Sequence, residues 1–306
     1  MKFSVVIPLH NKELYIEETL ASLASQTQKP FELIIVDDYS TDRSLEVARN
    51  YLACNQILFK DTRIEIIELT ANYGVGYARN VGFSKTTGDL VSFLDADDLY
   101  EKDLLKTASS LMKQYNIDFL VVGIQLFPSN EICPEIEKLE TEITPITEEA
   151  YYLNQPLKTV TSHNFYMGVG SNVILKRPHG ESVKYIEQRI IYQGIDYWYR
   201  VLKKMLSEGT PKIGLLMGAY LKVREVPGSA SRKTYKHWNE IDFPPVLSRF
   251  KHSSDYYDKR LMGVVGSRWI QHALSSLNSF SQKLKFVINY RKVFLKQGYY
   301  FFLHKF

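Results

Sequence analysis

Short apolar runs alternate with amphipathic stretches over the first 125 residues of the chain. Consecutive apolar positions predict strands that are buried on both faces, and apolar positions recurring every three or four residues predict helices. The predicted strands are 3–7 (ended by Pro8), 31–36, 63–69, 90–94 and 117–124, and the predicted helices are 13–26, 45–52, 78–85 and 101–115. This alternation predicts an α/β fold, in which helices flank a mostly parallel sheet.

The pattern changes after residue 125. Residues 125–160 are rich in Glu, Pro and Thr, which predicts a surface connection. A strand at 171–176, a helix at 195–206 and a strand at 214–226 follow, and the pattern is helical and aromatic from 234 onward. We therefore expect a catalytic-type domain over 1–233, with halves 1–125 and 126–233, and a helical C-terminal region over 234–306.

Composition narrows the class of protein. The 306 residues are 45% apolar, which suffices for a sizeable core, and the net charge of +4 is too small to predict nucleic-acid binding. Cys54 and Cys133 stand far apart, which excludes a disulfide framework and fits a reducing cytosol. The apolar runs 3–9 and 213–221 are shorter than the roughly 20 residues of a membrane span. We expect a cytoplasmic protein, soluble or peripheral on a membrane.

An acidic cluster follows the strand at 90–94, where Asp95, Asp97 and Asp98 come directly after buried positions. Like charges at the end of a core strand repel one another unless a cation or solvent relieves them. The cluster therefore predicts a Mg²⁺ or Mn²⁺ site, or else a solvated loop in which Asp97 or Asp98 caps the next helix.

Two other polar clusters, at 8–11 and 37–42, also follow predicted strands. Because the carboxyl ends of parallel strands meet at one edge of a sheet, the three clusters should lie together there. Ligands of such sheets bind at this edge. Three converging clusters favour a ligand site over helix caps alone.

The motifs in this order resemble those of the family 2 glycosyltransferases, which have the GT-A fold. The resemblance is strong over 1–125 and weaker over 165–233. The residues that carry it are 5–12, 22–27, 35–42, 72–74, 78–82, Gly88 and 93–98. It implies an inverting, metal-dependent transfer of a sugar from a nucleotide-sugar to an acceptor hydroxyl.

The resemblance also implies a nucleotide-binding role for four residues. Asp38 would bind the uracil ring of a UDP-sugar, since a carboxylate accepts the N3–H of uracil. Pro8 and Asn11 would lie along the nucleoside, and Arg79 near the nucleotide and its phosphates. The competing interpretations are a helix cap for Asp38, plain turn chemistry for Asn11 and a surface ion pair for Arg79.

Within the acidic cluster, the resemblance divides the roles. Asp95 would face the sugar and ribose and share in the metal site, Asp97 would bind Mn²⁺ or Mg²⁺ directly, and Asp98 would support the site or cap the next helix.

Residues 194–200 resemble the acidic motif that opens the acceptor-side helix in the family. The motif has two adjacent acids, and Ile195 stands where the first is expected. Asp196 matches the second acid, which is the usual catalytic base. The alternative is an aspartate favoured by the helix dipole.

Residues 224–232 resemble the family's terminal loop, which implies diphosphate contacts for Arg224, Ser231 and Arg232. The loop lacks the histidine often found there, and a solvated surface turn is the alternative.

Acceptor contacts are expected from the region 125–190 and the helix after it. The candidates are His163, Asn164, Tyr166, Glu187 and Trp198, although core packing explains the two aromatic residues, Tyr166 and Trp198, as well.

The C-terminal tail combines basic and aromatic residues. Residues 281–306 contain six Lys or Arg and no Asp or Glu. Such a segment suits an anionic membrane surface, or else forms a helix that packs on the domain with a solvated basic face.

The family resemblance also implies the class of acceptor. We expect a saccharide or lipid-linked saccharide of bacterial surface polysaccharide or glycolipid assembly.

Three other protein classes share features with this chain. A processive membrane synthase would need several spans and a Gln before Arg268–Trp269, where Val265 stands. A nucleotidyltransferase of related fold would carry a glycine-rich loop with Arg after the first strand, unlike 8–11. A non-catalytic sugar-nucleotide-binding module would be expected to lack the carboxylate of Asp97 or Asp196.

Overall fold

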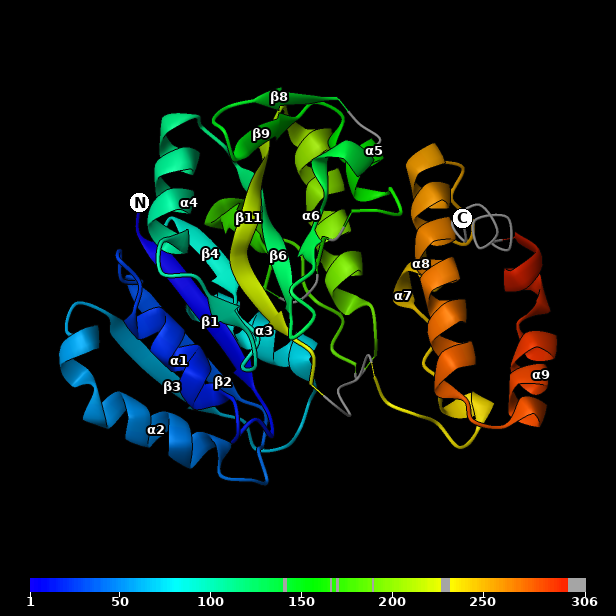
Figure 1. The fold of residues 1–306 in the computed structure, drawn as a ribbon, viewed down its shortest axis with the longest axis horizontal. Coiled ribbons are helices and arrows are strands. Elements are labelled where there is room, and N and C mark those ends of the chain that lie inside the picture. The colour runs from blue at the N-terminus through cyan, green and yellow to red at the C-terminus, as the bar shows by residue number, and fades with distance from the viewer. Residues whose placement is uncertain (140–141, 166, 169–170, 189, 227–231, 297–306) are drawn as a thin grey trace.

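The structure is a computed structural model that describes residues 1–139, 142–165, 167–168, 171–188, 190–226 and 232–296. Eleven strands of this part of the chain form one mixed sheet, and helices cover both of its faces (Figure 1). The strand order is β3-β2-β1-β4-β10-β6-β11-β9-β8, with β5 beside β11 and β7 beside β6.

The N-terminal half alternates strands and helices as predicted. Its elements are β1 (Phe3–Leu9), α1 (Ile16–Ala24), β2 (Glu32–Asp37), α2 (Ser44–Cys54), β3 (Arg63–Glu68), α3 (Val75–Lys85) and β4 (Leu90–Phe93). Strand β1 pairs in parallel with β2 and β4, and β2 pairs in parallel with β3. All four strands therefore end at the same edge of the sheet.

The second half completes the sheet with mixed pairing. Its elements are β5 (Leu99–Tyr100), α4 (Leu104–Gln114), β6 (Phe119–Phe127), β7 (Ile132–Cys133), β8 (Ile143–Pro145), β9 (Ala150–Leu153), α5 (Pro156–Val160), β10 (Val173–Lys176), α6 (Gln193–Glu208) and β11 (Ile213–Arg224). Strand β10 runs antiparallel between β4 and β6, and β11 is parallel to β6.

The C-terminal region is helical, as predicted. It contains α7 (Pro245–Arg249), α8 (Tyr256–Ser276) and α9 (Phe280–Asn289). No described helix is long and apolar enough to cross a membrane.

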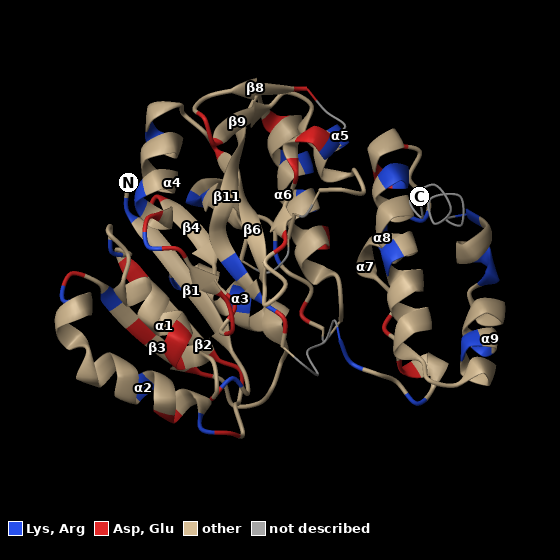
Figure 2. Ribbon diagram, viewed as in Figure 1, with Lys and Arg blue, Asp and Glu red and all other residues tan. Residues whose placement is uncertain are grey.

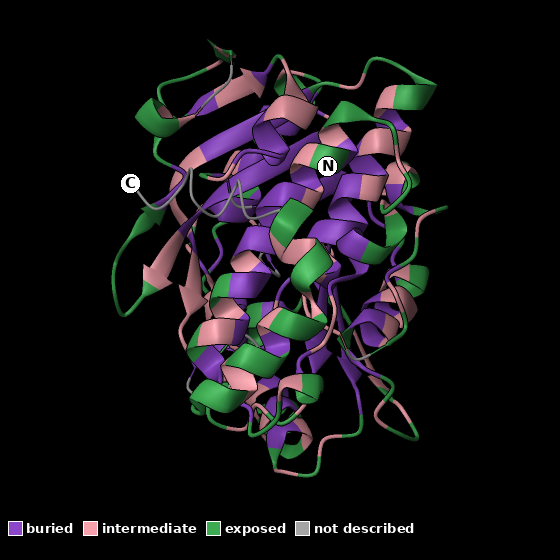
Figure 3. Cartoon of the chain, turned by 90° about the vertical axis from the view of Figure 1, so that its right-hand side faces the viewer, coloured by how far each residue is buried: buried purple, intermediate pink, exposed green. Residues whose placement is uncertain are grey.

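Alternate side chains of the strands build two cores on opposite faces of the sheet. Val5 and Ile7 of β1 pack in one core with α1 and α4, whereas Val6 packs in the other with α3 and α6. A third cluster forms around the buried Trp269 of α8 and Phe286 of α9. Figure 3 shows the exposed outer faces of the helices over these buried layers.

The structure corrects several expectations. Pro8 does not end the first strand, because β1 continues to Leu9 in register with β2. The carbonyl of Val6 points toward β4 and accepts a hydrogen bond from Leu94 N. The backbone of Pro8, two residues later, points to the same side of β1, but there it lies beyond the end of β4. The missing N–H of Pro8 therefore costs no ladder hydrogen bond.

The region 125–160 is also more regular than predicted. Strand β9 pairs with β11 and β8, so part of this segment extends the sheet instead of only connecting it. Helix α4 begins at Leu104, which leaves neither Asp97 nor Asp98 at its N-terminus.

Candidate active site

The turns after β1, β2 and β4 bring the three polar clusters together. Asn11 adopts a left-handed φ of 50°, and its side-chain Oδ1 accepts from Thr41 N at 2.8 Å. Asn11 N in turn donates to Ser40 Oγ at 3.2 Å. Asn11 thus joins the turn after β1 to the turn after β2, and Pro8 lies buried just before it.

Asp38 is buried directly after β2 and holds the loop that precedes α3. Its two carboxylate oxygens accept from Tyr73 N and Gly74 N, each at 2.7 Å. Each carboxylate oxygen has a second lone pair, so Asp38 can still accept from a ligand N–H. The helix-cap interpretation for α2 finds no support, because Asp38 makes no hydrogen bond to that helix among the described residues.

Arg79 and Asp95 form a pair beneath the site. Arg79 Nη2 lies 2.6 Å from Asp95 Oδ1, and the arginine side chain is almost wholly buried while that of Asp95 is about a third exposed. Arg79 is therefore not a surface ion pair. It orients Asp95, whose backbone N also donates to Ser171 Oγ at 2.8 Å.

Asp97 faces a positive charge from the end of β1. Lys12 Nζ lies 2.5 Å from Asp97 Oδ2, and both side chains are mostly buried. Among the described residues, no three His, Cys, Asp or Glu side chains are grouped so as to hold a metal alone. Carboxylate oxygens are hard ligands that suit Mg²⁺ or Mn²⁺, and Asp97 already contacts one cation, the ammonium group of Lys12. Phosphate oxygens and water would be the other ligands of such a metal ion.

Asp98 is buried beside Asp97 and accepts two hydrogen bonds. Ser171 Oγ donates to its Oδ2 at 2.8 Å, and Arg224 N donates to its Oδ1 at 3.2 Å. Burial, together with the nearby carboxylates of Asp95 and Asp97, raises the pKa of Asp98 well above its usual range.

The terminal loop is described only in part. Arg224 Nε donates to the carbonyl of Asp97 at 3.2 Å, and its guanidinium also pairs with Glu18. Arg232 pairs with Glu225. Ser231 lies outside the described residues, so its expected diphosphate contact stays a prediction.

Asp196 lies in the first turn of α6 and has no exposed side-chain surface. Arg200 Nε lies 2.8 Å from its Oδ2, and Arg249 Nε lies 2.8 Å from its Oδ1. The structure therefore presents Asp196 as a buried carboxylate held between two partly exposed arginines. A ligand could reach this carboxylate only if the side chains around it moved.

The proposed acceptor contacts are placed differently from one another. Trp198 is wholly buried and packs against Phe93 and Phe119, so core packing accounts for it. Glu187 Oε1 accepts from Asn80 Nδ2 at 3.1 Å. His163 is half-buried, Asn164 is exposed, and Tyr166 lies outside the described residues.

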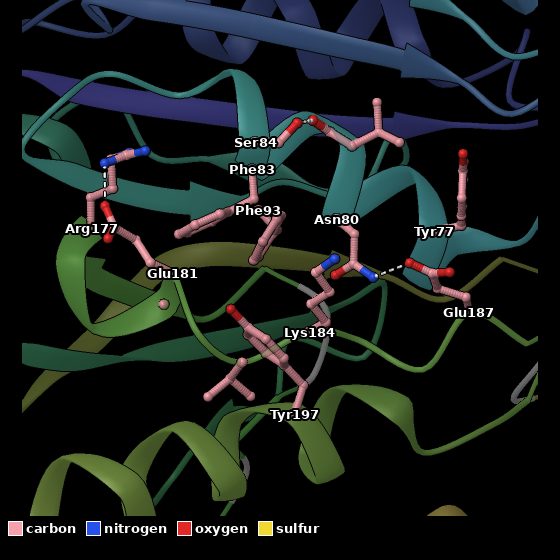
Figure 4. A pocket seen from close by; sticks show the side chains of 13 residues that line it. Tyr77, Asn80, Phe83, Ser84, Phe93, Arg177, Glu181, Lys184, Glu187 and Tyr197 are labelled. Carbon is pink, nitrogen blue, oxygen red and sulfur yellow. Dashed lines mark hydrogen bonds and ion pairs between the residues drawn. The ribbon is translucent and has the colours of Figure 1, made fainter.

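A groove of about 620 Å³ separates α3 from the segment 177–187 (Figure 4). Among the residues that line it are Tyr77, Asn80, Arg177, Lys184, Glu187 and Tyr197. Of the residues predicted to bind nucleotide or metal, none that the structure describes lines this groove, so it is distinct from the strand-end site.

Sequence reasoning missed the roles of three residues. In the sequence Lys12 stands out only as part of the motif 5–12, and no sequence pattern indicates that Ser171 or Arg249 bonds to the acidic residues.

Comparison with known proteins gives a matching family and several similar proteins. The family described as "Glycosyl transferase family 2" matches residues 4–176. The chain is 35% identical over 153 residues to the poly(ribitol-phosphate) beta-N-acetylglucosaminyltransferase TarS of Staphylococcus aureus, a match covering 47% of this chain and 26% of TarS. It is 35% identical over 123 residues to the putative teichuronic acid biosynthesis glycosyltransferase TuaG of Bacillus subtilis, covering 40% of this chain and 46% of TuaG. These matches span less than half of each relative.

Solved structures share the fold at low identity. The structure of S. aureus TarS 1–349 in complex with UDP-GlcNAc superposes with a TM-score of 0.61 at 21% identity, over 97% of this chain and 92% of that one. A mannosyltransferase from Pyrobaculum calidifontis in complex with GDP-Man and Mn²⁺ gives a TM-score of 0.51 at 14% identity, over 98% of this chain and 72% of that one. The arrangement of strands and helices is thus the one seen in nucleotide-sugar complexes of other proteins.

Proposed function

Because this chain belongs to glycosyl transferase family 2, we propose that it transfers a sugar from a UDP-sugar to an acceptor hydroxyl with inversion at the anomeric carbon. The observation that carries the proposal is the convergence of Asp38, Asp95 and Asp97 at one edge of the sheet. Asp38 would accept the uracil N3–H, and Pro8 and Asn11 would flank the nucleoside. The similarity of the fold to a UDP-GlcNAc complex supports a uridine nucleotide.

The proposal includes a divalent cation, Mn²⁺ or Mg²⁺, held by Asp97 with Asp95. Such a cation would offset the negative charge of the departing diphosphate. Arg79 keeps Asp95 oriented through their 2.6 Å contact. Lys12, Arg224 and Arg232 would add positive charge near the diphosphate, with Ser231 as a further contact.

Asp196 is the proposed general base. It would take the proton of the acceptor hydroxyl while the hydroxyl oxygen attacks the anomeric carbon and the bond to the diphosphate breaks. One base acting without a covalent intermediate gives inversion. Since the Asp196 side chain is buried in this structure, the side chains around it would have to move before an acceptor hydroxyl could reach it.

The proposed acceptor is a saccharide or lipid-linked saccharide of bacterial surface polysaccharide or glycolipid assembly. The names of the relatives, which refer to poly(ribitol-phosphate) and teichuronic acid, support this class. The proposed place of action is the cytoplasmic face of the membrane.

Helix α9 supports peripheral binding to an anionic membrane. Phe280, Leu284 and Ile288 recur every four residues and are 80%, 50% and 55% exposed, so they form one apolar stripe. Basic side chains lie along the same helix and just after it (Figure 2): Lys283, Lys285, Arg291, Lys292 and Lys296. Apolar side chains beside several Lys and Arg suit the interface of an anionic bilayer.

A panel of UDP-sugars incubated with the full chain and Mn²⁺ tests the function. We expect slow release of UDP from one donor, abolished by EDTA and by Asp97→Asn. UDP binding without hydrolysis of any donor, in the presence of Mn²⁺, would instead indicate a non-catalytic binding module.

A further inference from the structure

Asp196 is held by two arginines that come from different parts of the chain. Arg200 lies four residues later on the same helix, with its Nε 2.8 Å from Oδ2. Arg249 comes from α7 and approaches side-on, with Nε 2.8 Å from Oδ1 and Nη2 3.4 Å from Oδ2. Arg249 therefore contacts both oxygens of the carboxylate, whereas Arg200 contacts one.

The C-terminal helices pack firmly against α6 around this contact. Val246 of α7 and Leu261 and Val265 of α8 are buried in the same core as Trp198 and Leu202 of α6. This core reaches past residue 233, where the sequence pattern suggested a boundary. The segment that carries Arg249 is thus anchored to the sheet-covering helix.

A second polar contact ties the same elements together at a different place. Lys203 Nζ lies 2.7 Å from Asp258 Oδ1, and Tyr199 OH donates to the same oxygen at 2.8 Å. Asp258 also accepts from Ser253 Oγ at 2.6 Å. This cluster fastens α8 to α6 but does not contact Asp196, so it provides an internal comparison for the role of Arg249.

The two arginines cannot have the same effect on the orientation of Asp196. Arg200 contacts only one oxygen of Asp196, and its Nη2 donates to the carbonyl of Lys184 at 2.8 Å, so it links the carboxylate to the segment before α6. Arg249 is attached to another element and engages both oxygens, which sets the plane of the carboxylate. Ile195, which replaces the expected neighbouring acid, is buried in the core and offers neither guanidinium a second carboxylate.

We propose that Arg249 is a positioning residue for Asp196. The helical C-terminal region, which carries Arg249, thereby contributes to the acceptor side of the active site. The inference rests on the proposed role of Asp196 as general base. Arg249 does not contact the donor; it fixes the direction from which Asp196 meets the acceptor hydroxyl. Misplacing a catalytic group by about 1 Å costs on the order of 100-fold in rate.

The test compares four variants of the full chain: Arg249→Gln, Arg249→Lys, Asp196→Asn and Lys203→Met. The readouts are UDP release from UDP-N-acetylglucosamine with Mn²⁺, separated into kcat and KM, and calorimetric binding of UDP. For Arg249→Gln we expect kcat to fall about 10- to 100-fold, with KM and UDP affinity within twofold of wild type. Arg249→Lys should restore part of kcat, because it returns the charge without the side-on contact.

Lys203→Met is the matched control, since it removes the ion pairs that Lys203 of α6 makes with Asp255 and Asp258. We expect it to lower the melting temperature while kcat stays within twofold of wild type. Equal losses of kcat in Lys203→Met and Arg249→Gln would show that Arg249 acts only by holding the helices together. That result would overturn the proposal, as would an unchanged kcat in Arg249→Gln.

Two outcomes separate this inference from the proposed function. If Asp196→Asn keeps the wild-type kcat, the assignment of the base is wrong and the role of Arg249 falls with it. If wild type releases no UDP from this donor, amide hydrogen exchange gives an independent readout. Arg249→Gln should then speed exchange in the first turn of α6, where Lys203→Met should not, and equal exchange in both variants would refute the positioning role.

Discussion

Lys12 Nζ lies 2.5 Å from Asp97 Oδ2, so the end of β1 supplies a positive charge to the carboxylate that we propose as metal ligand. The two residues are 85 positions apart in the chain and meet because β1 and β4 are parallel neighbours. A divalent cation bound to Asp97 has to displace this ammonium group or share the carboxylate with it.

We therefore expect Lys12→Met to tighten Mn²⁺ binding to the nucleotide-free protein. A partly exposed ion pair is worth about 0.2–1 kcal/mol, so the dissociation constant should fall by up to about fivefold. Titration of Mn²⁺ followed by electron paramagnetic resonance measures it. Lys113→Met, which removes an exposed lysine of α4, serves as the control and should leave the affinity unchanged. Weaker Mn²⁺ binding in Lys12→Met would contradict the competition.

The buried carboxylate of Glu32 should make the free energy of unfolding depend on pH in the acid range. Burial alone would raise the pKa of this carboxyl, but hydrogen bonds from Ser4, Thr87, Arg63 and Gly88 reverse the effect and lower it to about 2. Because the folded pKa is below that of the unfolded chain, the carboxylate stabilises the fold above about pH 4.5. This contribution, about 3 kcal/mol, is lost as the pH falls toward 2.

Urea unfolding of Glu32→Gln between pH 7 and pH 3 tests this expectation. The variant should be less stable at pH 7, and its stability should fall less steeply with acid than that of wild type. Glu65→Gln, which removes a half-buried partner of the same Arg63, should keep the wild-type acid profile. Parallel acid profiles for Glu32→Gln and wild type would show that Glu32 is not the group responsible.

Gly82 allows α3 to lie close against β1. A Cβ at this position would collide with Cγ1 of Val6 and would lie 3.2 Å from Cγ2 of Val36. We expect Gly82→Val to lower the free energy of unfolding by about 2 kcal/mol, because overpacking a core costs about 1–3 kcal/mol. Gly209→Val is the control, since nothing lies within 4 Å of the added Cβ there. Chemical denaturation should show a change below about 0.5 kcal/mol for the control; an equal loss in both variants would refute the packing explanation.

The exposed stripe of α9 predicts binding to anionic vesicles. We expect the full chain to co-sediment with phosphatidylglycerol vesicles at low salt, and not with phosphatidylcholine vesicles, because the neighbouring side chains are basic. The triple variant Phe280→Ser, Leu284→Ser, Ile288→Ser should lose most of this binding. Ile57→Ser, which removes a residue 79% exposed outside the C-terminal region, should not. Absence of wild-type binding at low salt would exclude the membrane surface as a partner.

The N-terminal half of the fold could be predicted because its signals are local. Each buried run in β1, β2 and β4 is continuous, and each is followed directly by polar residues that the parallel arrangement brings to one edge. The strand-end position of Asp38 and Asp97 follows from this pattern alone. The prediction that Pro8 ends the first strand was wrong, because β1 continues to Leu9. Only the arrangement of the neighbouring strands shows that the missing N–H of Pro8 faces no hydrogen-bond partner.

Contacts between distant segments could not be predicted in the same way. Strand β10 has three apolar residues followed by Lys176, and nothing in its sequence specifies that it lies antiparallel between β4 and β6. Ser171 reaches Asp98 across 73 positions, and Arg249 reaches Asp196 across 53. A serine or an arginine can bond to many partners in a folded chain. Only the packing of β10 and α7 brings Ser171 to Asp98 and Arg249 to Asp196.

Anomalous diffraction from crystals of the full chain grown with UDP and Mn²⁺ tests the central claim most directly. We expect a manganese peak at coordination distance from a carboxylate oxygen of Asp97, with the diphosphate beside it and the uracil ring against Asp38. UDP bound elsewhere, or manganese without contact to Asp97, would contradict the proposed donor site.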